Sequence, residues 1–300
     1  MPYSPIVVFA FNRLVPLKIC IDSLLSNTEA AESHLIVYVD GPRPQINGDR
    51  DKVEEVRQFV MGITGFKSVK YHFAEKNKGL GPSVISGVTE LMREYGKAII
   101  VEDDIICSSN FLSFLNQGLD FYEDYKDVFS VSGESIVVKC PEGYPYHNYF
   151  APRAGCWGWA TWADRWNSVD WNLENWVDVA KNRKAFNDWG GSDCYSLLNG
   201  WHKGKNKSWA IRFNYAQFIQ KKTSVFPIVS KVKNTGFQND GTNCKQVSYN
   251  RFKMDFDTSS NKNFFFQLPV VEDVFFVKQR LKPVSLSMRL YAKLRNIFHI

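Results

Sequence analysis

Residues 98–104 constrain the fold more than any other stretch, because four apolar residues run directly into three consecutive carboxylates. A short apolar run after a glycine is typical of a strand that is buried on both faces, as in the parallel sheets of α/β proteins. Open α/β sheets bind ligands at the carboxyl ends of such strands. Because side chains alternate along a strand, we expect Glu102 and Asp104 to point one way and Asp103 the other.

Three neighbouring carboxylates repel one another unless a cation lies among them. Mn²⁺ and Mg²⁺ prefer oxygen ligands and often share them with substrate phosphates. The run 102–104 therefore favours a metal or nucleotide site at a strand end. The alternative is an acidic strand end that is merely solvated.

Apolar periodicity makes strands and helices alternate through the first half of the chain. This order predicts an α/β fold, with a mostly parallel, Rossmann-type sheet and helices on both faces. The predicted strands are 6–11, 35–39, 68–73, 98–102 and 128–131, and the predicted helices are 16–26, 51–61, 83–95 and 111–125.

Tryptophan is confined to the second half of the chain, where all nine tryptophans lie between Trp157 and Trp209. Aromatic rings pack against the C–H faces of sugars and bases, and the indole N–H offers a donor. The segment therefore suggests an acceptor pocket, with Trp157 and Trp159 as its candidate lining. The alternative is a loop-rich subdomain that uses tryptophan to build a small core.

The net charge of +6 is supplied by the C-terminal tail, because six basic residues and no acidic residue follow Asp273. The body is neutral by this count, which argues against a nucleic-acid partner. The six cysteines are scattered, as reduced thiols of a cytosolic protein are. With neither a signal-peptide pattern nor an apolar run near the roughly 20 residues of a membrane span, we expect a cytoplasmic location.

Several motifs at predicted strand ends coincide with those of one enzyme class: Asn12-Arg13, Asp40, the loop 77–81, Glu102-Asp103-Asp104 and the later cluster 155–159. Over residues 4–240 the chain resembles a GT-A-type glycosyltransferase, most of all the N-acetylglucosaminyltransferase I family and its bacterial relatives in surface-polysaccharide synthesis. The resemblance implies a nucleotide-sugar-binding half at 1–135, an acceptor-binding half of the same catalytic domain at 136–276, and a basic tail at 277–300.

The resemblance also implies roles for single residues. Asp104 would bind Mn²⁺ (or Mg²⁺) directly, and Glu102 and Asp103 would hold hydroxyls of the donor and waters of the metal. Arg13 would meet the diphosphate, since a fixed guanidinium fork suits phosphate oxygens. Asp40 would accept a hydrogen bond from uracil. A surface ion pair is the alternative for Arg13, and an Asx turn with Gly41-Pro42 is the alternative for Asp40.

The general base departs from the family pattern. In the relatives a carboxylate precedes a tryptophan upstream of an arginine, whereas the counterpart here, 207–212, has no carboxylate. We expect the base to come from Asp193 first, and otherwise from Glu134 or Asp164. Lost or altered activity is the remaining alternative.

The resulting hypothesis is an inverting, metal-dependent glycosyltransferase that moves a sugar from a nucleotide-sugar, most of all a UDP-sugar, to a glycan or lipid-linked glycan acceptor. A nucleotidyltransferase and a non-enzymatic carbohydrate-binding protein are the alternatives. In the tail, Leu290, Leu294, Ile297 and Phe298 have helical spacing and basic neighbours. This pattern predicts an amphipathic helix that makes weak peripheral contact with the inner face of the cytoplasmic membrane, or else docks on the protein body.

Overall fold

The centre of the protein is an eight-stranded sheet, seen in a computed structural model that describes residues 3–236 and 249–298. Six strands run in one direction, and β7 and β8 run against them. The sheet is therefore mostly parallel, as predicted. In spatial order its strands are β3 (Ser68–Phe73), β2 (His34–Val39), β1 (Ile6–Ala10), β4 (Lys97–Glu102), β8 (Trp159–Trp162), β6 (Val128–Ser132), β9 (Thr223–Pro227) and β7 (Asn148–Ala151).

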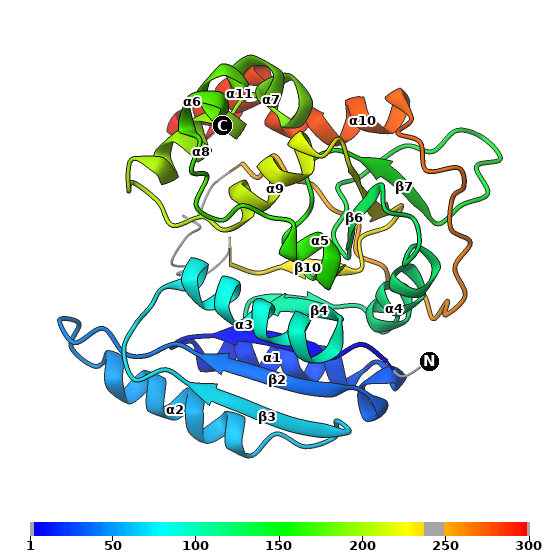
Figure 1. Cartoon of the computed structure of the whole chain (residues 1–300). Coiled ribbons are helices and arrows are strands. Elements are labelled where there is room, and N and C mark those ends of the chain that lie inside the picture. Colours follow the sequence, from blue (N-terminus) through cyan, green and yellow to red (C-terminus); the bar gives the residue numbers. More distant parts are fainter. Residues whose placement is uncertain (1–2, 237–248, 299–300) are drawn as a thin grey trace.

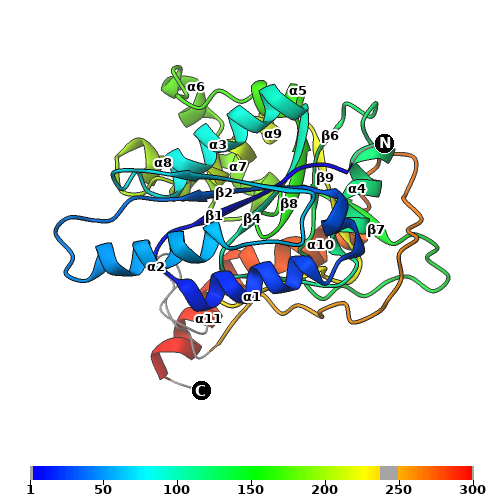
Figure 2. The same cartoon turned by 90° about the horizontal axis from the view of Figure 1, so that it is seen from below.

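Helices cover both faces of this sheet (Figures 1 and 2). Alternate residues of β1 face opposite ways, so Ile6 and Val8 join one core and Val7 and Phe9 the other. The first core is closed by α1 (Leu14–Leu25), α2 (Asp49–Met61) and α4 (Phe111–Phe121), and the second by α3 (Leu80–Tyr95), α5 (Ala163–Asn167) and α9 (Ala210–Ile219). The predicted α/β architecture with two helical layers is confirmed.

Two predicted helix boundaries differ from the observed ones by three residues or more, and the others by at most two. The helix predicted to start at residue 83 begins at Leu80, directly after Gly79. The φ of Gly79 is +80°, and the preceding loop ends at this residue. The helix predicted over 111–125 ends at Phe121, because Tyr122 turns its hydroxyl to the carbonyl of Gln267, at 2.9 Å, and packs into the core.

The tryptophan-rich segment adds a small helical layer to the sheet. Its helices α6 (Trp176–Lys181), α7 (Arg183–Gly190) and α8 (Cys194–His202) lie next to α9. Buried residues of this layer form a satellite core around Phe186, Leu198 and Tyr215. The strands β7, β8 and β9 continue the sheet across residue 135, so both halves of the chain share one sheet.

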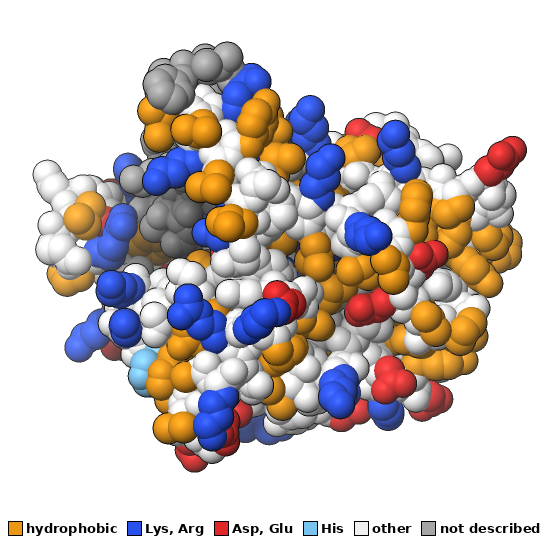
Figure 3. Space-filling view, turned by 90° about the horizontal axis from the view of Figure 1, so that it is seen from above, with side chains coloured by type: hydrophobic (Ala, Val, Ile, Leu, Met, Phe, Trp, Pro, Cys, Tyr) orange, Lys and Arg blue, Asp and Glu red, His pale blue; other side chains and the backbone are white. Residues whose placement is uncertain are grey.

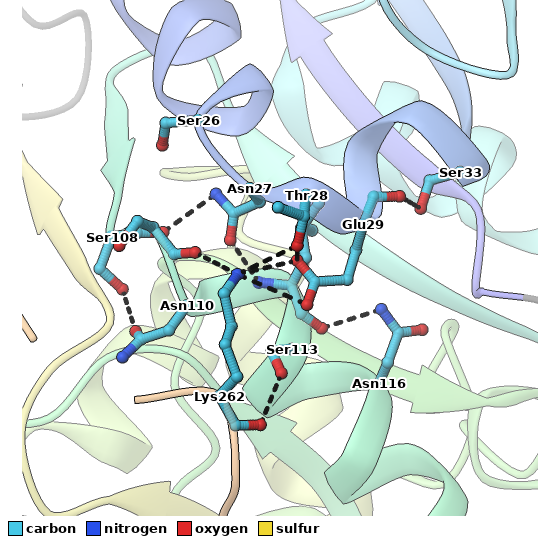
Figure 4. A network of polar contacts seen from close by, with 12 residues as sticks. Ser26, Asn27, Thr28, Glu29, Ser33, Ser108, Asn110, Ser113, Asn116 and Lys262 are labelled. Carbon is cyan, nitrogen blue, oxygen red and sulfur yellow. Dashed lines mark hydrogen bonds and ion pairs between the residues drawn. The ribbon is translucent and has the colours of Figure 1, made fainter. Parts of the chain in front are cut away.

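The C-terminal segment returns to the first half and is tied there by polar contacts (Figure 4). Lys262 donates to Glu29 Oε2 at 3.1 Å and to the carbonyl of Ser109 at 2.6 Å. Asn27 accepts from the backbone N–H of Leu112 at 3.0 Å and so caps α4. A two-stranded sheet of β5 (Ile105–Cys107) and β10 (Val232–Asn234) makes a second tie, and α10 (Val274–Leu281) and α11 (Leu286–Phe298) follow.

The described cysteines carry free thiols: Cys20, Cys107, Cys140, Cys156 and Cys194. Cys244 lies outside the described residues. Within residues 3–236 and 249–298, no helix combines the length and apolar character of a membrane span.

Candidate active site

The strand order reverses between β1 and β4, and two predicted donor-site motifs meet at that point. β1 leads into Arg13 and β4 leads into the carboxylates. The Arg13 guanidinium bonds to Asp103 Oδ1 and, at 2.9 Å, to Asp104 Oδ2. Ligands of open α/β sheets bind at such a switch point. The strand end that the sequence predicted as the donor site therefore lies at the switch point of the sheet.

The three carboxylates are not arranged as strand alternation predicted. β4 ends at Glu102, and residues 103–104 form a turn before β5. The turn brings Asp103 and Asp104 to the same guanidinium, so these two carboxylates do not point opposite ways. Arg13 therefore forms ion pairs with both aspartates at the strand end. It is not a separate side chain that is left free for a phosphate.

Burial and the neighbouring charges make Glu102 and Asp103 hard to ionise. Burial, and then the charges of Asp104 and Asp103, raise the pKa of Glu102 to about 8, although Arg13 opposes the shift. Burial also raises the pKa of Asp103 to about 6, against the opposing charge of Arg13. A further cation at this strand end would relieve both effects.

Asp104 has the feature expected of a metal ligand. Its Oδ2 bonds to Arg13, whereas its Oδ1 is buried and has no hydrogen-bond partner among residues 3–236 and 249–298. Buried carboxylate oxygens are normally satisfied, so an orphaned one fits a bound cation. No group of three or more His, Cys, Asp or Glu in the described residues is placed to hold a metal. From the described residues Asp104 would supply one carboxylate, and phosphates and water would supply further oxygens, a pattern typical of Mg²⁺ and Mn²⁺.

Sequence reasoning missed the segment that covers Asp104. Thr235 donates to the Asp104 carbonyl from its N–H and its hydroxyl, each at 3.0 Å. A Cβ on Gly236 would lie 2.5 Å from Asp104 Oδ2, so only glycine fits there. The Asn-Thr-Gly triplet at 234–236 was the available signal, because it marks a turn at the end of a strand.

Asp40 also lies at this edge, where it joins two loops. Its carboxylate accepts backbone hydrogen bonds from Gly41 at 2.9 Å, from Lys78 at 2.8 Å and from Gly79 at 2.8 Å. Asp40 makes these hydrogen bonds in place of the Asx turn with Gly41-Pro42, which was the alternative interpretation of this residue. Asp40 thereby fixes the loop 77–79 that leads into α3.

Glu134 and Cys156 form the second half of the candidate site. Glu134 follows β6, whose carboxyl end lies at the same sheet edge as that of β4, and its Oε1 accepts from Arg280 of α10 at 2.7 Å. The Cys156 thiol lies among charges: burial and the carboxylates of Glu134 and Glu102 raise its pKa, and Arg153 and Arg280 oppose this. Glu102 ends β4 and Glu134 follows β6, so both carboxylates belong to the same edge of the sheet.

Gly155, in the cluster 155–159, allows the chain to pack closely against Glu134. A Cβ on Gly155 would lie 2.4 Å from Ser132 Oγ and 2.7 Å from Glu134 Oε1. The close approach that Gly155 permits is therefore to the end of β6 and the loop after it, whereas Gly158 lies against Phe111 and Val232.

Asp193 is held more tightly than a free base would be. Arg153 donates to both of its oxygens, at 2.7 Å and 3.2 Å. Burial opposes ionisation of Asp193, but the hydrogen bonds and charge of Arg153 outweigh it and lower the pKa of this carboxyl. Asp193 thus sits at the start of α8 as half of a bidentate ion pair.

Asp164 lies away from the other candidates, which corrects its assignment as a catalytic residue. β8 runs against β4, and Trp162 pairs with Lys97 at the amino end of β4. Five further residues of β4, at about 3.3 Å each, put Glu102 at least about 17 Å away. Asp164 bonds instead to Arg165 at 2.7 Å and pairs with Lys126 at 3.1 Å, at the surface in the first turn of α5.

The two tryptophans assigned to the acceptor pocket are placed differently. Trp159 is 1% exposed and stacks on Trp209 at 5.0 Å between ring centroids, so it is a core residue and offers no face to a sugar. Trp157 is partly buried and packs edge-on against Phe252 at 6.1 Å. Of the pair, only Trp157 stays a candidate contact for the acceptor.

The segment 207–212 contributes to packing through Trp209 and Arg212. Trp209 packs under Trp159, and the Arg212 guanidinium lies 4.6 Å from the centre of the Trp201 ring. Burial lowers the pKa of Arg212 to about 10. Arg212 Nη1 bonds to the carbonyl of Trp171 at 2.7 Å, which compensates part of that burial.

A cavity of about 380 Å³ lies apart from this edge. It opens between α6 and the carboxyl end of α9, close to Ser168 and Gln220. α9 leads into Thr223, which pairs with the first residue of β6, so the cavity is at the opposite end of the strands. It takes no part in the candidate site.

Comparisons with known proteins give only remote likenesses. No family model matches the chain, and no curated protein matches it significantly. Among solved structures, TarS of S. aureus has a TM-score of 0.38 at 11% identity, over 76% of this chain and 35% of its own. This chain thus spans about a third of TarS.

Two further structures resemble the chain to a similar degree. UDP-glucose pyrophosphorylase complexed with UDP-glucose has a TM-score of 0.36 at 11% identity, over 77% of this chain and 92% of its own. A candidate nucleotide-diphospho-sugar transferase from Desulfovibrio desulfuricans has a TM-score of 0.32 at 12% identity, over 62% and 77%. Scores of this size assign neither family nor activity. The fold class rests on the strand order and the two helical layers.

Proposed function

We propose that the protein is a metal-dependent glycosyltransferase that uses a nucleotide-sugar donor, most of all a UDP-sugar. One observation carries the proposal: at the switch point of the sheet, Arg13 holds two aspartates, one of which keeps a buried oxygen without a partner in the described part of the chain. A guanidinium beside an unsatisfied carboxylate suits a metal diphosphate, because it offers one group for the phosphate oxygens and one for the metal.

In the proposed mechanism, Asp104 would hold Mn²⁺ or Mg²⁺. The bound ion would neutralise charge on the departing diphosphate. Arg13 shares that task when it exchanges one of its aspartate partners for a phosphate oxygen, and Glu102 and Asp103 orient hydroxyls of the donor.

Glu134 is the proposed general base for the acceptor hydroxyl. It follows β6 at the same sheet edge as Glu102, and Arg280 bonds one of its oxygens. Asp193 is a weaker candidate, since Arg153 occupies both of its oxygens. A base that removes the hydroxyl proton from the face opposite the diphosphate would give inversion. Trp157 is the proposed acceptor contact, and a glycan or lipid-linked glycan of surface-polysaccharide synthesis is the proposed acceptor.

The decisive experiment combines donor binding with turnover. Thermal-shift screening of nucleotide-sugars should show stabilisation that requires Mn²⁺ or Mg²⁺, and the stabilising donor should be hydrolysed slowly to the nucleotide diphosphate. Asp104→Asn should abolish both effects, whereas Asp124→Asn, at an exposed position after α4, should change neither. Stabilisation that ignores the metal, or an active Asp104→Asn variant, would reject the proposal.

The same assays distinguish a glycosyltransferase from the two alternative functions. A nucleotidyltransferase would release pyrophosphate from a nucleoside triphosphate and a sugar phosphate. A carbohydrate-binding protein would bind glycans and hydrolyse no donor. Glu134→Gln should retain metal-dependent UDP binding but lose transfer to an acceptor by about a hundredfold or more, the usual scale for loss of a general base.

A further inference from the structure

Helix α11 carries its apolar stripe on the side that faces solvent. Leu286, Leu290, Leu294 and Ile297 are 61%, 54%, 56% and 57% exposed. At 100° per residue these four side chains fall within an arc of about 80°. The side chain of Phe298 lies outside the described part of the chain. A surface helix of a globular protein normally turns such a stripe inward, so the orientation is reversed.

The opposite side of α11 makes the contacts with the body. Ala292, about 160° from the middle of the stripe, is buried. Asn296 Oδ1 accepts from the Tyr249 N–H at 2.7 Å, and Arg289 donates to Ser192 Oγ at 3.0 Å. The helix also contacts Tyr249 through Met288 and Tyr291, and the stripe of Leu286, Leu290, Leu294 and Ile297 stays exposed.

Charge decides which partner this stripe fits. Lys293 lies beside the stripe and is exposed, Lys282 is exposed at the preceding turn, and no acidic residue follows Asp273. On the face that carries α10 and α11, Figure 3 shows hydrophobic side chains next to lysine and arginine side chains. A second copy docked on the same stripe would bring these like charges together, whereas an anionic lipid surface would neutralise them.

We propose that the outward face of α11, made of Leu286, Leu290, Lys293, Leu294 and Ile297, binds anionic membrane surfaces. The leucine and isoleucine side chains enter the boundary between headgroups and acyl chains, and the lysines stay among the headgroups. The geometry of this face is independent of the proposed function, which only supplies its purpose: a lipid-linked acceptor would be met at the same surface.

The test is co-sedimentation of the full chain with vesicles of phosphatidylcholine, with or without phosphatidylglycerol. The wild-type protein should sediment with the anionic vesicles, and added salt should weaken the binding. Leu290→Gln/Leu294→Gln should lower the partition coefficient by at least about tenfold. Lys293→Glu should lower it by at least about fivefold at low salt. All these positions are exposed, so thermal unfolding should change little.

Val177→Gln is the matched control, because Val177 is 65% exposed on another short helix, α6. It should bind vesicles as the wild type does. Wild-type protein that stays in the supernatant, an unaffected double-leucine variant, or an equal loss in Val177→Gln would each overturn the proposal. A concentration-dependent dimer that the double-leucine variant abolishes, with no vesicle binding, would assign the face to a second copy instead. None of these readouts needs a nucleotide-sugar, so they fail or succeed separately from the proposed enzymatic function.

Discussion

The metal-free protein should lose stability as the pH rises from 5 to 8, and Glu102 should cause most of the loss. The pKa of Glu102 is raised to about 8 in the folded chain, from an ordinary value of 4.5. At pH values between these two the folded chain keeps a proton that the unfolded chain releases. The stabilising contribution is therefore complete below pH 4.5 and is lost progressively as the pH rises towards 8.

The magnitude follows from this difference in bound protons. Each pH unit in that window costs about 1.4 kcal/mol, so the step from pH 5 to pH 8 removes roughly 4 kcal/mol. For a chain of this length, that corresponds to a fall in Tm on the order of 6 °C. Asp103, with a pKa raised to about 6, should steepen the fall at the acidic end of the window.

The assay is thermal or urea unfolding after removal of metal with EDTA, at several pH values. Glu102→Gln keeps the size of the side chain and removes its titration, so its stability should vary far less with pH. Glu55→Gln, at an exposed position of α2, should keep the slope of the wild type. Stability that is constant or rises between pH 5 and 8, or a Glu102→Gln variant with an unchanged slope, would refute the electrostatic reasoning. Mn²⁺ should flatten the wild-type profile, because a cation at Asp104 favours ionised neighbours.

Two further predictions concern the second half of the site. Arg280→Met should cost about 3–5 kcal/mol in urea unfolding, because it leaves the buried carboxylate of Glu134 unpaired, and adding Glu134→Gln should recover part of that loss; a double variant no more stable than the single one would contradict this account. Trp159→Ala should destabilise the protein by about 3–5 kcal/mol, because it truncates a core residue. Trp157→Ala should fold nearly normally and weaken acceptor use. A Trp157→Ala variant that is less stable than Trp159→Ala would show that Trp157 is the core residue of the two.

The strands and helices of the first half could be predicted because their signals are local. Short apolar runs mark β1, β2 and β4, and periodic apolar residues mark α2 and α3. The antiparallel strand β8 is different, since Trp159–Trp162 inserts between β4 and β6 from far along the chain. Its apolar run carries no information about strand direction, which only the pairing with β4 decides.

The candidate site divides in the same way. The sequence located Arg13 and the carboxylates 102–104, since each follows a predicted strand. It could not show that Asp103 turns towards Arg13, because alternation holds only while the strand continues, and β4 ends one residue earlier. The partner of Glu134 was equally out of reach: Arg280 lies 146 residues away.

The tail shows how a correct pattern can leave orientation undecided. Periodicity predicted the helix and its apolar stripe, but a stripe alone fits either a buried or an exposed face. The contacts of Val284 also bear on how the tail should be tested, because its carbonyl accepts from the Ser192 N–H at 3.1 Å and from the Ser192 hydroxyl at 2.9 Å. A chain cut after Lys282 would lose these bonds beside Asp193 together with α11. Point substitutions on the outward face leave Val284 and Arg280 in place, and so they separate membrane binding from support of the site.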